Sequence, residues 1–400
     1  MILNKKFYKF IWVAILYFFS GLPLGFFYVF LPVFFRTQGI DLVKIGFFSS
    51  AGIFWSLKPF WAPIIDKYFY KKTWISLALL GISISLLCLV HFQANSNLFF
   101  IFLFGLTFSS AVLDTALDGF IIEWIEPENL GNVNGIRVSF YRIAMIFSGG
   151  LLTALSQYLK FDFIFYFLSF LTFSGAISVF LSSALKVKPI GKKILSLKEQ
   201  YFYPLLDLFK RSHIFLIFIF IATYKIGDAL LGGMVYPFWV DKGFSRLEIG
   251  LISGTLGSIF SILGSLIGGY YTSKWGVKKS LLIMGIFQAL SNLVYAISAL
   301  PFIEKKIIYF ASITESFTGG LGTASFITFL TFLCKKEFSS TQYAIFSTLF
   351  SLTLVIGRSI SGLGAKYMGY FWFFLITFFI ALLPLLLISY IFKTPEYNKI

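Results

Sequence analysis

LFFIFLFGLTFSSAVLDTALDGFII, residues 98–122, decides the fold, because it places Asp114 and Asp118 inside an otherwise apolar run. Residues four apart on a helix share one face, so the two carboxylates would lie roughly 6 Å apart. A charged side chain at the centre of a lipid-facing helix costs about 2.5–3.5 kcal/mol. The stretch therefore predicts a membrane helix whose two acids face other helices and meet cations there.

The rest of the chain has the same membrane-like composition. Of its 400 residues, 58% are hydrophobic and 12% are charged, and the mean hydropathy is +0.86. Apolar runs recur along the whole length, which excludes a sizeable soluble domain and predicts a polytopic helical membrane protein. The net charge of +16 lies in short connectors, which indicates membrane orientation and not a nucleic-acid partner.

Twelve apolar segments of membrane-spanning length predict an all-α membrane protein with two six-helix bundles. We expect an N-terminal bundle over residues 1–184, a cytoplasmic basic linker over 185–212 and a C-terminal bundle over 213–400. The linker becomes amphipathic toward its end, which is typical of a helix on the membrane surface. The predicted spans cover approximately residues 10–35, 44–65, 73–93, 97–122, 132–158, 161–184, 213–240, 246–271, 277–300, 305–332, 339–368 and 369–392.

The distribution of basic residues predicts the orientation. With both termini in the cytoplasm, the cytoplasmic segments hold 20 Lys and Arg residues and the outer segments hold 8. Such an excess on the cytoplasmic side is typical of membrane proteins. We therefore expect a multi-pass protein of a bacterial cytoplasmic (inner) membrane with both termini inside.

The two halves repeat weakly. Residues 39–46 resemble residues 243–250, and residues 66–72 resemble residues 273–279. Two related six-helix bundles are typical of a transporter whose site lies between its halves. The short basic connector at the same point of each half favours a gating motif, in which we place Asp66, Lys67 and Lys274. The alternative is ordinary placement of lysines at the cytoplasmic surface.

Charged residues inside the predicted spans are the candidate functional residues. Eight such charges would cost about 20–28 kcal/mol if unpaired in lipid, which exceeds the net stability of a typical protein, about 5–15 kcal/mol. Acids inside a membrane can carry protons and cations suit an anionic substrate, although structural ion pairs remain an alternative for each residue. The proposed proton-coupling acids are Asp114, Asp118, Asp228 and Glu315, and the proposed substrate-binding cations are Lys58, Arg142, Lys225 and Arg358.

No other site chemistry is indicated. His91 and His213 are isolated near span ends, and Cys88 and Cys334 show neither metal-ligand spacing nor a disulfide framework. Nucleotide-binding glycine patterns are missing from the sequence. We therefore expect no metal, no cofactor and no enzymatic activity.

Several short stretches together resemble one family of transporters. The chain resembles the AmpG-type muropeptide permeases of the major facilitator superfamily, and it is similar in some of the same places to the neighbouring acetyl-coenzyme A transporters. The matching stretches are Phe19–Leu24, Ile45–Phe48, Lys58–Pro63 with Asp66, Asp114 with Asp118, Tyr141–Arg142, Ser148–Gly150, Tyr224–Ala229, Gly319–Ala324, Thr341–Ala344 and Gly357–Arg358.

The resemblance implies proton-driven import of N-acetylglucosaminyl-anhydro-N-acetylmuramyl peptides, which are anionic sugar-peptides. It also adds Tyr224 to the candidate substrate-binding residues. We expect a monomer whose partners are this small molecule, protons and the lipid bilayer. The alternatives are transport of another anionic metabolite such as an acyl-coenzyme A, a membrane-embedded transferase, and a sensor that kept the fold without transport. The linker 185–212 has two acids and no His, which counts against the transferase.

Overall fold

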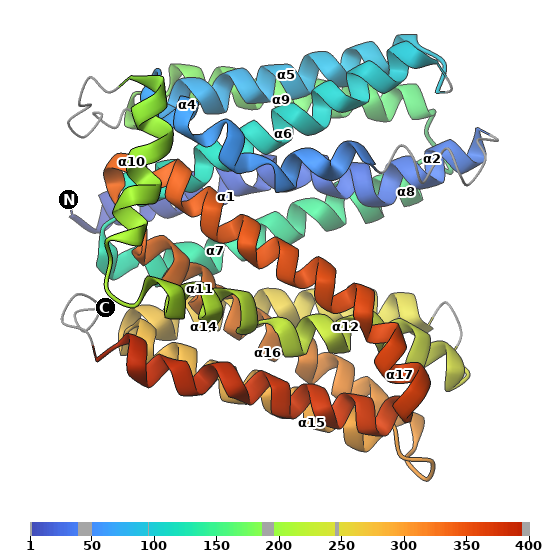
Figure 1. Cartoon of the computed structure of the whole chain (residues 1–400). Coiled ribbons are helices and arrows are strands. Elements are labelled where there is room, and N and C mark those ends of the chain that lie inside the picture. Colours follow the sequence, from blue (N-terminus) through green and yellow to red (C-terminus); the bar gives the residue numbers. More distant parts are fainter. Residues whose placement is uncertain (1, 39–49, 95, 186–195, 245–247, 394–400) are drawn as a thin grey trace. The chain divides into compact units, whose positions relative to one another are not determined.

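The described chain is helical throughout. The computed structural model describes residues 2–38, 50–94, 96–185, 196–244 and 248–393, and no strand occurs among them (Figure 1). The all-α prediction is therefore confirmed for this part of the chain. Residues 186–195, which hold four of the linker lysines, lie outside it.

The first half of the sequence supplies the helices up to residue 185. They are α1 (Ile2–Gly25), η1 (Phe26–Phe30), α2 (Leu31–Thr37), η2 (Ser50–Ser56), η3 (Lys58–Phe60), α4 (Ala62–Lys67), α5 (Lys71–His91), α6 (Asn97–Trp124), η4 (Pro127–Asn129), α7 (Leu130–Met145), η5 (Ile146–Leu151), α8 (Leu152–Leu155), α9 (Phe161–Leu181) and η6 (Ser183–Leu185).

The second half begins with the linker helix. Its elements are α10 (Leu197–Phe209), α11 (Ile214–Thr223), α12 (Ile226–Asp241), η7 (Ile249–Leu256), α14 (Gly257–Trp275), α15 (Val277–Ser298), α16 (Lys305–Phe332), η8 (Lys336–Phe338) and α17 (Ser339–Ile391). Each of the twelve predicted spans thus contains helix in its described part. Nine described helical segments are long and apolar enough to cross a membrane.

Several spans depart from a continuous α-helix, and the first, fifth and eighth contain the π-helices η1, η5 and η7. In the second span, the described residues form two short 3₁₀ helices and α4, and Pro59 and Pro63 start the last two. Proline has no backbone N–H, so neither residue can continue the hydrogen bonding of a preceding turn. The seventh span breaks at Tyr224 and Lys225, between α11 and α12. Within α17, Gly369 has φ 76° and ψ 160°, which ends one span and begins the next at the predicted boundary.

The contacts divide the chain into two compact units. The first unit contains residues 1–125, 140–205 and 334–345, and the second contains 126–139, 206–333 and 346–400. Each unit is therefore built mainly from one half of the sequence and takes in a short segment from the other half. Those two segments hold the N-terminal turns of α7 and α17.

Close helix contacts in the second unit depend on glycine. A Cβ at Gly264 would collide with the carbonyl of Phe317, and one at Gly320 would collide with the carbonyl of Ser261. Small residues let two membrane helices approach backbone to backbone. This contact fixes α16 against α14, and α16 carries Glu315.

The linker helix α10 begins with a reciprocal cap. The Ser196 hydroxyl accepts a hydrogen bond from the Glu199 N–H at 3.2 Å, and the Glu199 carboxylate accepts one from the Ser196 N–H at 2.6 Å. This capping box satisfies N–H groups that a helix start leaves without partners. The bond from the Ser196 backbone holds the pKa of Glu199 below its usual value.

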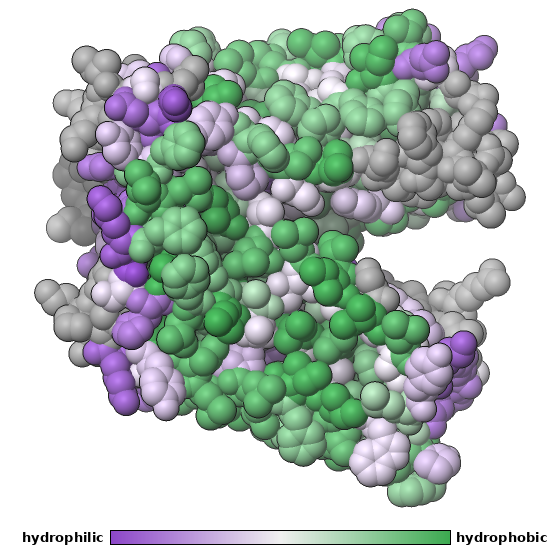
Figure 2. Space-filling model, viewed as in Figure 1, coloured by the Kyte–Doolittle hydropathy of each residue, from purple (hydrophilic) through white to green (hydrophobic). Residues whose placement is uncertain are grey.

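The outer surfaces of both units suit a lipid environment. Figure 2 shows hydrophobic side chains along the helices and hydrophilic side chains gathered near the helix ends. Phe170 on α9 is 70% exposed and Leu386 on α17 is 66% exposed. Large exposed apolar side chains along whole helices are expected where the surrounding solvent is lipid.

Candidate functional site

The centre of the first unit holds a buried group of three charges. The Nζ atom of Lys58 lies 3.1 Å from Oδ2 of Asp114 and 3.8 Å from Oδ2 of Asp118. The three side chains are 12%, 11% and 4% exposed. The structure therefore brings the span-2 cation to both acids of α6, so neither acid is left without a counter-charge.

Helix α1 supplies a hydroxyl to each of these acids. The Ser20 hydroxyl donates to Oδ1 of Asp114, and the Tyr17 hydroxyl donates to Oδ1 of Asp118 at 3.4 Å. Hydrogen bonds to a buried carboxylate offset part of its desolvation. In the sequence, Ser20 was named only as part of the stretch Phe19–Leu24 and Tyr17 was not named, because neutral hydroxyls are common in membrane helices and give no comparable signal.

Two tryptophans of the second span donate hydrogen bonds to side chains of α6. Trp55 donates through Nε1 to the Ser110 hydroxyl at 3.3 Å, and Trp61 donates to the Thr115 hydroxyl at 3.3 Å. These bonds hold the irregular segment η2–η3 against α6. Lys58 lies between the two tryptophans in sequence, so they help fix its backbone.

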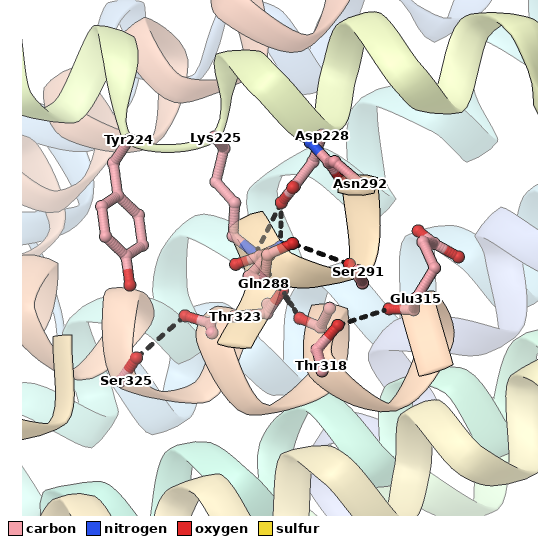
Figure 3. Close-up of polar contacts among 12 residues, drawn as sticks. Tyr224, Lys225, Asp228, Gln288, Ser291, Asn292, Glu315, Thr318, Thr323 and Ser325 are labelled. Atoms are coloured by element: carbon pink, nitrogen blue, oxygen red, sulfur yellow. Dashed lines mark hydrogen bonds and ion pairs between the residues drawn. The ribbon is translucent and has the colours of Figure 1, made fainter. Parts of the chain in front are cut away.

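The second unit holds a different charged cluster, formed by Lys225, Asp228 and Gln288 (Figure 3). The Nζ atom of Lys225 lies 3.3 Å from Oδ2 of Asp228 and donates to Oε1 of Gln288 at 2.7 Å. The Gln288 amide nitrogen donates to the Asp228 carboxylate. All three side chains therefore satisfy one another, and Asp228, at 19% exposure, is more open than Lys225 at 5%.

The backbone around this cluster explains its position. Lys225 lies at the break between α11 and α12, and its Nζ is 3.5 Å from the carbonyl oxygen of Gly319. A Cβ at Gly322 would collide with Oε1 of Gln288. The glycines of α16 thus leave room for the Lys225–Gln288 pair. Gln288 was missed in the sequence because a lone Gln in an apolar helix has many structural uses.

The structure also locates the remaining candidate residues for substrate binding and proton coupling. Their functional roles stay predictions. Tyr224 is 5% exposed, donates to the Leu281 carbonyl at 3.0 Å and stacks on Phe326 with ring centroids 5.1 Å apart. Arg142 on α7 and Glu315 on α16 are half-buried, and Arg358 on α17 is exposed.

The predicted gating residue Asp66 caps the N-terminus of α17 within the first unit. Its carboxylate accepts hydrogen bonds from the N–H groups of Ser340 at 3.1 Å and Thr341 at 2.8 Å, and from the Thr341 hydroxyl at 2.7 Å. The first N–H groups of a helix have no partner inside the helix and carry a partial positive charge. A buried carboxylate is therefore a favourable cap for this helix.

A lysine extends this cap to a second acid. The Nζ atom of Lys71 lies 2.5 Å from Oδ1 of Asp66 and 2.9 Å from Oε1 of Glu123. Glu123 also accepts a hydrogen bond from the Ser339 hydroxyl at 3.1 Å. Lys67, the other predicted residue here, is half-buried, and its Nζ lies 5.3 Å from the ring centroid of Tyr68.

The position in the second unit that corresponds to Asp66 carries an uncharged side chain. Ser273 stands where the repeat has Asp66, and its hydroxyl accepts a hydrogen bond from the N–H of Asn132 at 3.0 Å. Asn132 lies in the first turn of α7, so the repeat again places a side-chain acceptor at a helix N-terminus. Lys274 is exposed. In both halves, a side-chain oxygen at this position therefore accepts a hydrogen bond from the N-terminus of a helix. The side chain is a charged carboxylate in the first half and a neutral hydroxyl in the second.

Comparison with known proteins gives a consistent result. The model of the Major Facilitator Superfamily matches residues 13–226 and 217–399. The anhydromuropeptide permease of Escherichia coli strain K12 is 29% identical over 398 residues, which cover 97% of this chain and 80% of that protein. The putative transporter AmpG 4 of Rickettsia felis is 27% identical over 98% of this chain and 99% of its own length. These relatives confirm the resemblance to AmpG-type permeases.

Solved structures show the same fold at low sequence identity. The fucose:proton symporter FucP of E. coli has a TM-score of 0.74 and 14% identity, covering 96% of this chain and 98% of its own. The human organic anion transporter MFSD10 has a TM-score of 0.74 and 12% identity, covering 94% and 97%. The predicted transporter fold is therefore confirmed.

Proposed function

The chain belongs to the Major Facilitator Superfamily, and we propose that it is a proton-coupled transporter that imports anhydro-muropeptides across the bacterial cytoplasmic membrane by alternating access. The observation that carries this proposal is the buried group Lys58–Asp114–Asp118. It occurs in a chain whose similar proteins include an anhydromuropeptide permease. We further propose that both termini lie in the cytoplasm and that the protein works as a monomer.

The charge balance of the two clusters supports a proton site in the first unit. When all three groups are ionised, Lys58, Asp114 and Asp118 carry one net negative charge. Lys225 and Asp228 together carry none. The acids of the first cluster outnumber its lysine, and we propose that this cluster holds the transported proton.

The same cluster links the proton to an anionic substrate. In the described arrangement, the ammonium of Lys58 is engaged by both carboxylates. A proton on either acid leaves Lys58 paired with one carboxylate in place of two, so that its ammonium can also pair with a substrate carboxylate. Arg142 and Arg358 are proposed as further carboxylate partners, with Lys225 and Tyr224 on the second unit. Proton binding and anion binding would then favour each other, as reciprocal linkage between two sites requires.

The Asp66 cap is proposed as part of the gate. Alternating access requires contacts that hold one state and break in the other. The bonds from Ser340 and Thr341 to Asp66, together with the pair to Lys71, suit this task, because they join a helix end to a buried charge.

Uptake into proteoliposomes tests the proposed function. Purified protein would be reconstituted and supplied with labelled anhydro-muropeptide, with and without an inward proton gradient. We expect accumulation only with the gradient, and competition by unlabelled anhydro-muropeptide but not by an acyl-coenzyme A. Competition by the acyl-coenzyme A alone would assign the alternative substrate, and absence of accumulation under both conditions would overturn the proposal.

A further inference from the structure

A partly open cavity of about 210 Å³ lies in the first unit, between the linker helix α10 and the start of α17. An apolar cavity of about 150 Å³ is large enough to hold a benzene molecule, so this one can hold several carbon atoms of a ligand. Three segments of the chain form its walls. They contribute Pro59 and Phe60 of η3 with Pro63 of α4, Tyr201 and Leu205 of α10, and Thr341 of α17.

The walls of this cavity suit a hydrocarbon. Two of the wall residues are prolines, which have no backbone N–H. The Tyr201 hydroxyl donates to the Phe60 carbonyl, and the Thr341 hydroxyl donates to Oδ2 of Asp66 at 2.7 Å, so neither hydroxyl has a proton left for a ligand. A buried water needs two to four polar partners, and a sugar or peptide group would also need donors. An apolar chain needs none.

The cavity adjoins an exposed apolar surface. Two of its wall residues reach that surface, since Phe60 is 68% exposed and Leu205 is 37% exposed. On α10, Phe202, Leu206 and Phe209 are also exposed, and with Leu205 they have the three- and four-residue spacing of one helix face. Figure 1 shows α10 lying crosswise at one end of α5 and α6. An amphipathic helix in this position places its apolar face at the boundary of the acyl chains.

The charges around α10 favour an anionic headgroup. Lys198 and Lys210 are exposed near the two ends of α10. In the sequence, residues 186–198 contain five lysines and no acid. Basic residues next to an amphipathic helix attract anionic lipids to the membrane surface. An anionic phospholipid such as phosphatidylglycerol is therefore expected beside the cavity.

We propose that this cavity, which we call the linker cavity, binds one acyl chain of an anionic phospholipid whose headgroup stays at the membrane surface. The lipid site goes beyond the proposed function, because its occupation needs neither a substrate nor a proton gradient. Thr341 belongs both to the wall of the cavity and to the Asp66 cap, where its N–H donates to Oδ2 of Asp66 at 2.8 Å. A bound chain therefore packs against the cap and stabilises it.

A photoreactive lipid tests the site. The full-length protein would be reconstituted in phosphatidylcholine vesicles that contain a small fraction of phosphatidylglycerol with a diazirine in one acyl chain. After illumination, mass spectrometry would locate the labelled residues. We expect Ile345, which also lines the cavity, to be labelled about tenfold more strongly than Leu386, which is 66% exposed on α17 outside the cavity. Unlabelled phosphatidylglycerol should compete for this labelling, and added phosphatidylcholine should not.

Two tryptophan variants of α10 separate the cavity from the general lipid surface. Leu205→Trp places a larger side chain in the cavity, and Leu206→Trp is the matched control, because Leu206 is 47% exposed on the same helix and does not line the cavity. Labelling of Ile345 should fall about tenfold in Leu205→Trp and stay unchanged in the control.

Backbone amide exchange at Thr341 reports the effect of the lipid on the cap. With unlabelled lipids, exchange in the wild type and in Leu206→Trp should be about fivefold slower in vesicles that contain phosphatidylglycerol than in pure phosphatidylcholine, because binding of the lipid and closure of the cap favour each other. In Leu205→Trp, exchange should be the same in both kinds of vesicle.

Three results would overturn the lipid site. They are labelling of Ile345 no stronger than that of Leu386, equal competition by phosphatidylcholine, and labelling that persists in Leu205→Trp. In each case the label would report the general lipid surface. Labelling that meets every expectation in a protein that fails to transport muropeptides would support the lipid site and reject only the proposed function.

Discussion

Replacing Asp66 by Asn should loosen the N-terminal turn of α17. The substitution keeps the size of the side chain but removes the charge that holds Lys71 and accepts three hydrogen bonds from Ser340 and Thr341. Removing one partner of a buried ion pair costs about 3–5 kcal/mol. Asn retains one acceptor oxygen, and Lys71 retains Glu123 at 2.9 Å, so the lower end of this range applies.

The assay is hydrogen exchange of individual backbone amides. A loss of about 3 kcal/mol corresponds to roughly a 100-fold faster exchange, since each 1.4 kcal/mol is tenfold. The acceleration should be confined to Ser340, Thr341 and the next turn of α17. The matched control is Ser273→Ala, which removes one neutral hydrogen bond to the N–H of Asn132. That loss of about 1 kcal/mol should accelerate exchange at Asn132 only about fivefold.

Equal acceleration in the two variants, or unchanged exchange at Ser340 and Thr341 in Asp66→Asn, would refute this reasoning. The charge on the cap would then contribute nothing beyond a neutral acceptor.

Two further substitutions and one pH dependence follow from the contacts. Gly322→Ala should lower the melting temperature and destabilise the fold by about 1–3 kcal/mol, because the new Cβ collides with Gln288. Gly232→Ala is its control, since nothing lies within 4 Å of a Cβ there, and it should stabilise α12 by up to about 1 kcal/mol; equal effects would contradict the packing. The pKa of Glu199 is lowered in the folded state, so its contribution is complete above the unfolded pKa of about 4.3 and is lost as the pH falls through the lower, folded pKa. Amide exchange at Ser196 should rise over that window, and Glu199→Gln should remove the pH dependence; a pH dependence that persists in the variant would exclude this cap as its cause.

The charged residues of the candidate site could be recognised in the sequence, because burying a charge in a membrane is costly. Asp114 and Asp118 stand out in an apolar run, and that cost requires a cation nearby. The structure places Lys58 beside both. Hydrophobic segments of span length likewise predict helices, since a bilayer leaves few other ways to satisfy the backbone.

Neutral partners and distant contacts could not be predicted. Gln288, Ser20 and Tyr17 cost little in a membrane helix, so their presence carries no comparable signal. The basic run after Asp66 does not reveal that Lys71 is its ion-pair partner. The N–H groups that Asp66 accepts from are more than 270 residues away, where no short-range pattern connects the two segments.

The most direct test of proton coupling is the proton flux that accompanies substrate entry. Wild-type proteoliposomes would be placed in weakly buffered medium without a gradient, and anhydro-muropeptide would be added while the external pH is recorded. The account predicts alkalinisation of the medium that depends on substrate, and its loss in Asp118→Asn together with loss of gradient-driven uptake. Substrate entry without any pH change in the wild type, or an unchanged signal in Asp118→Asn, would contradict it.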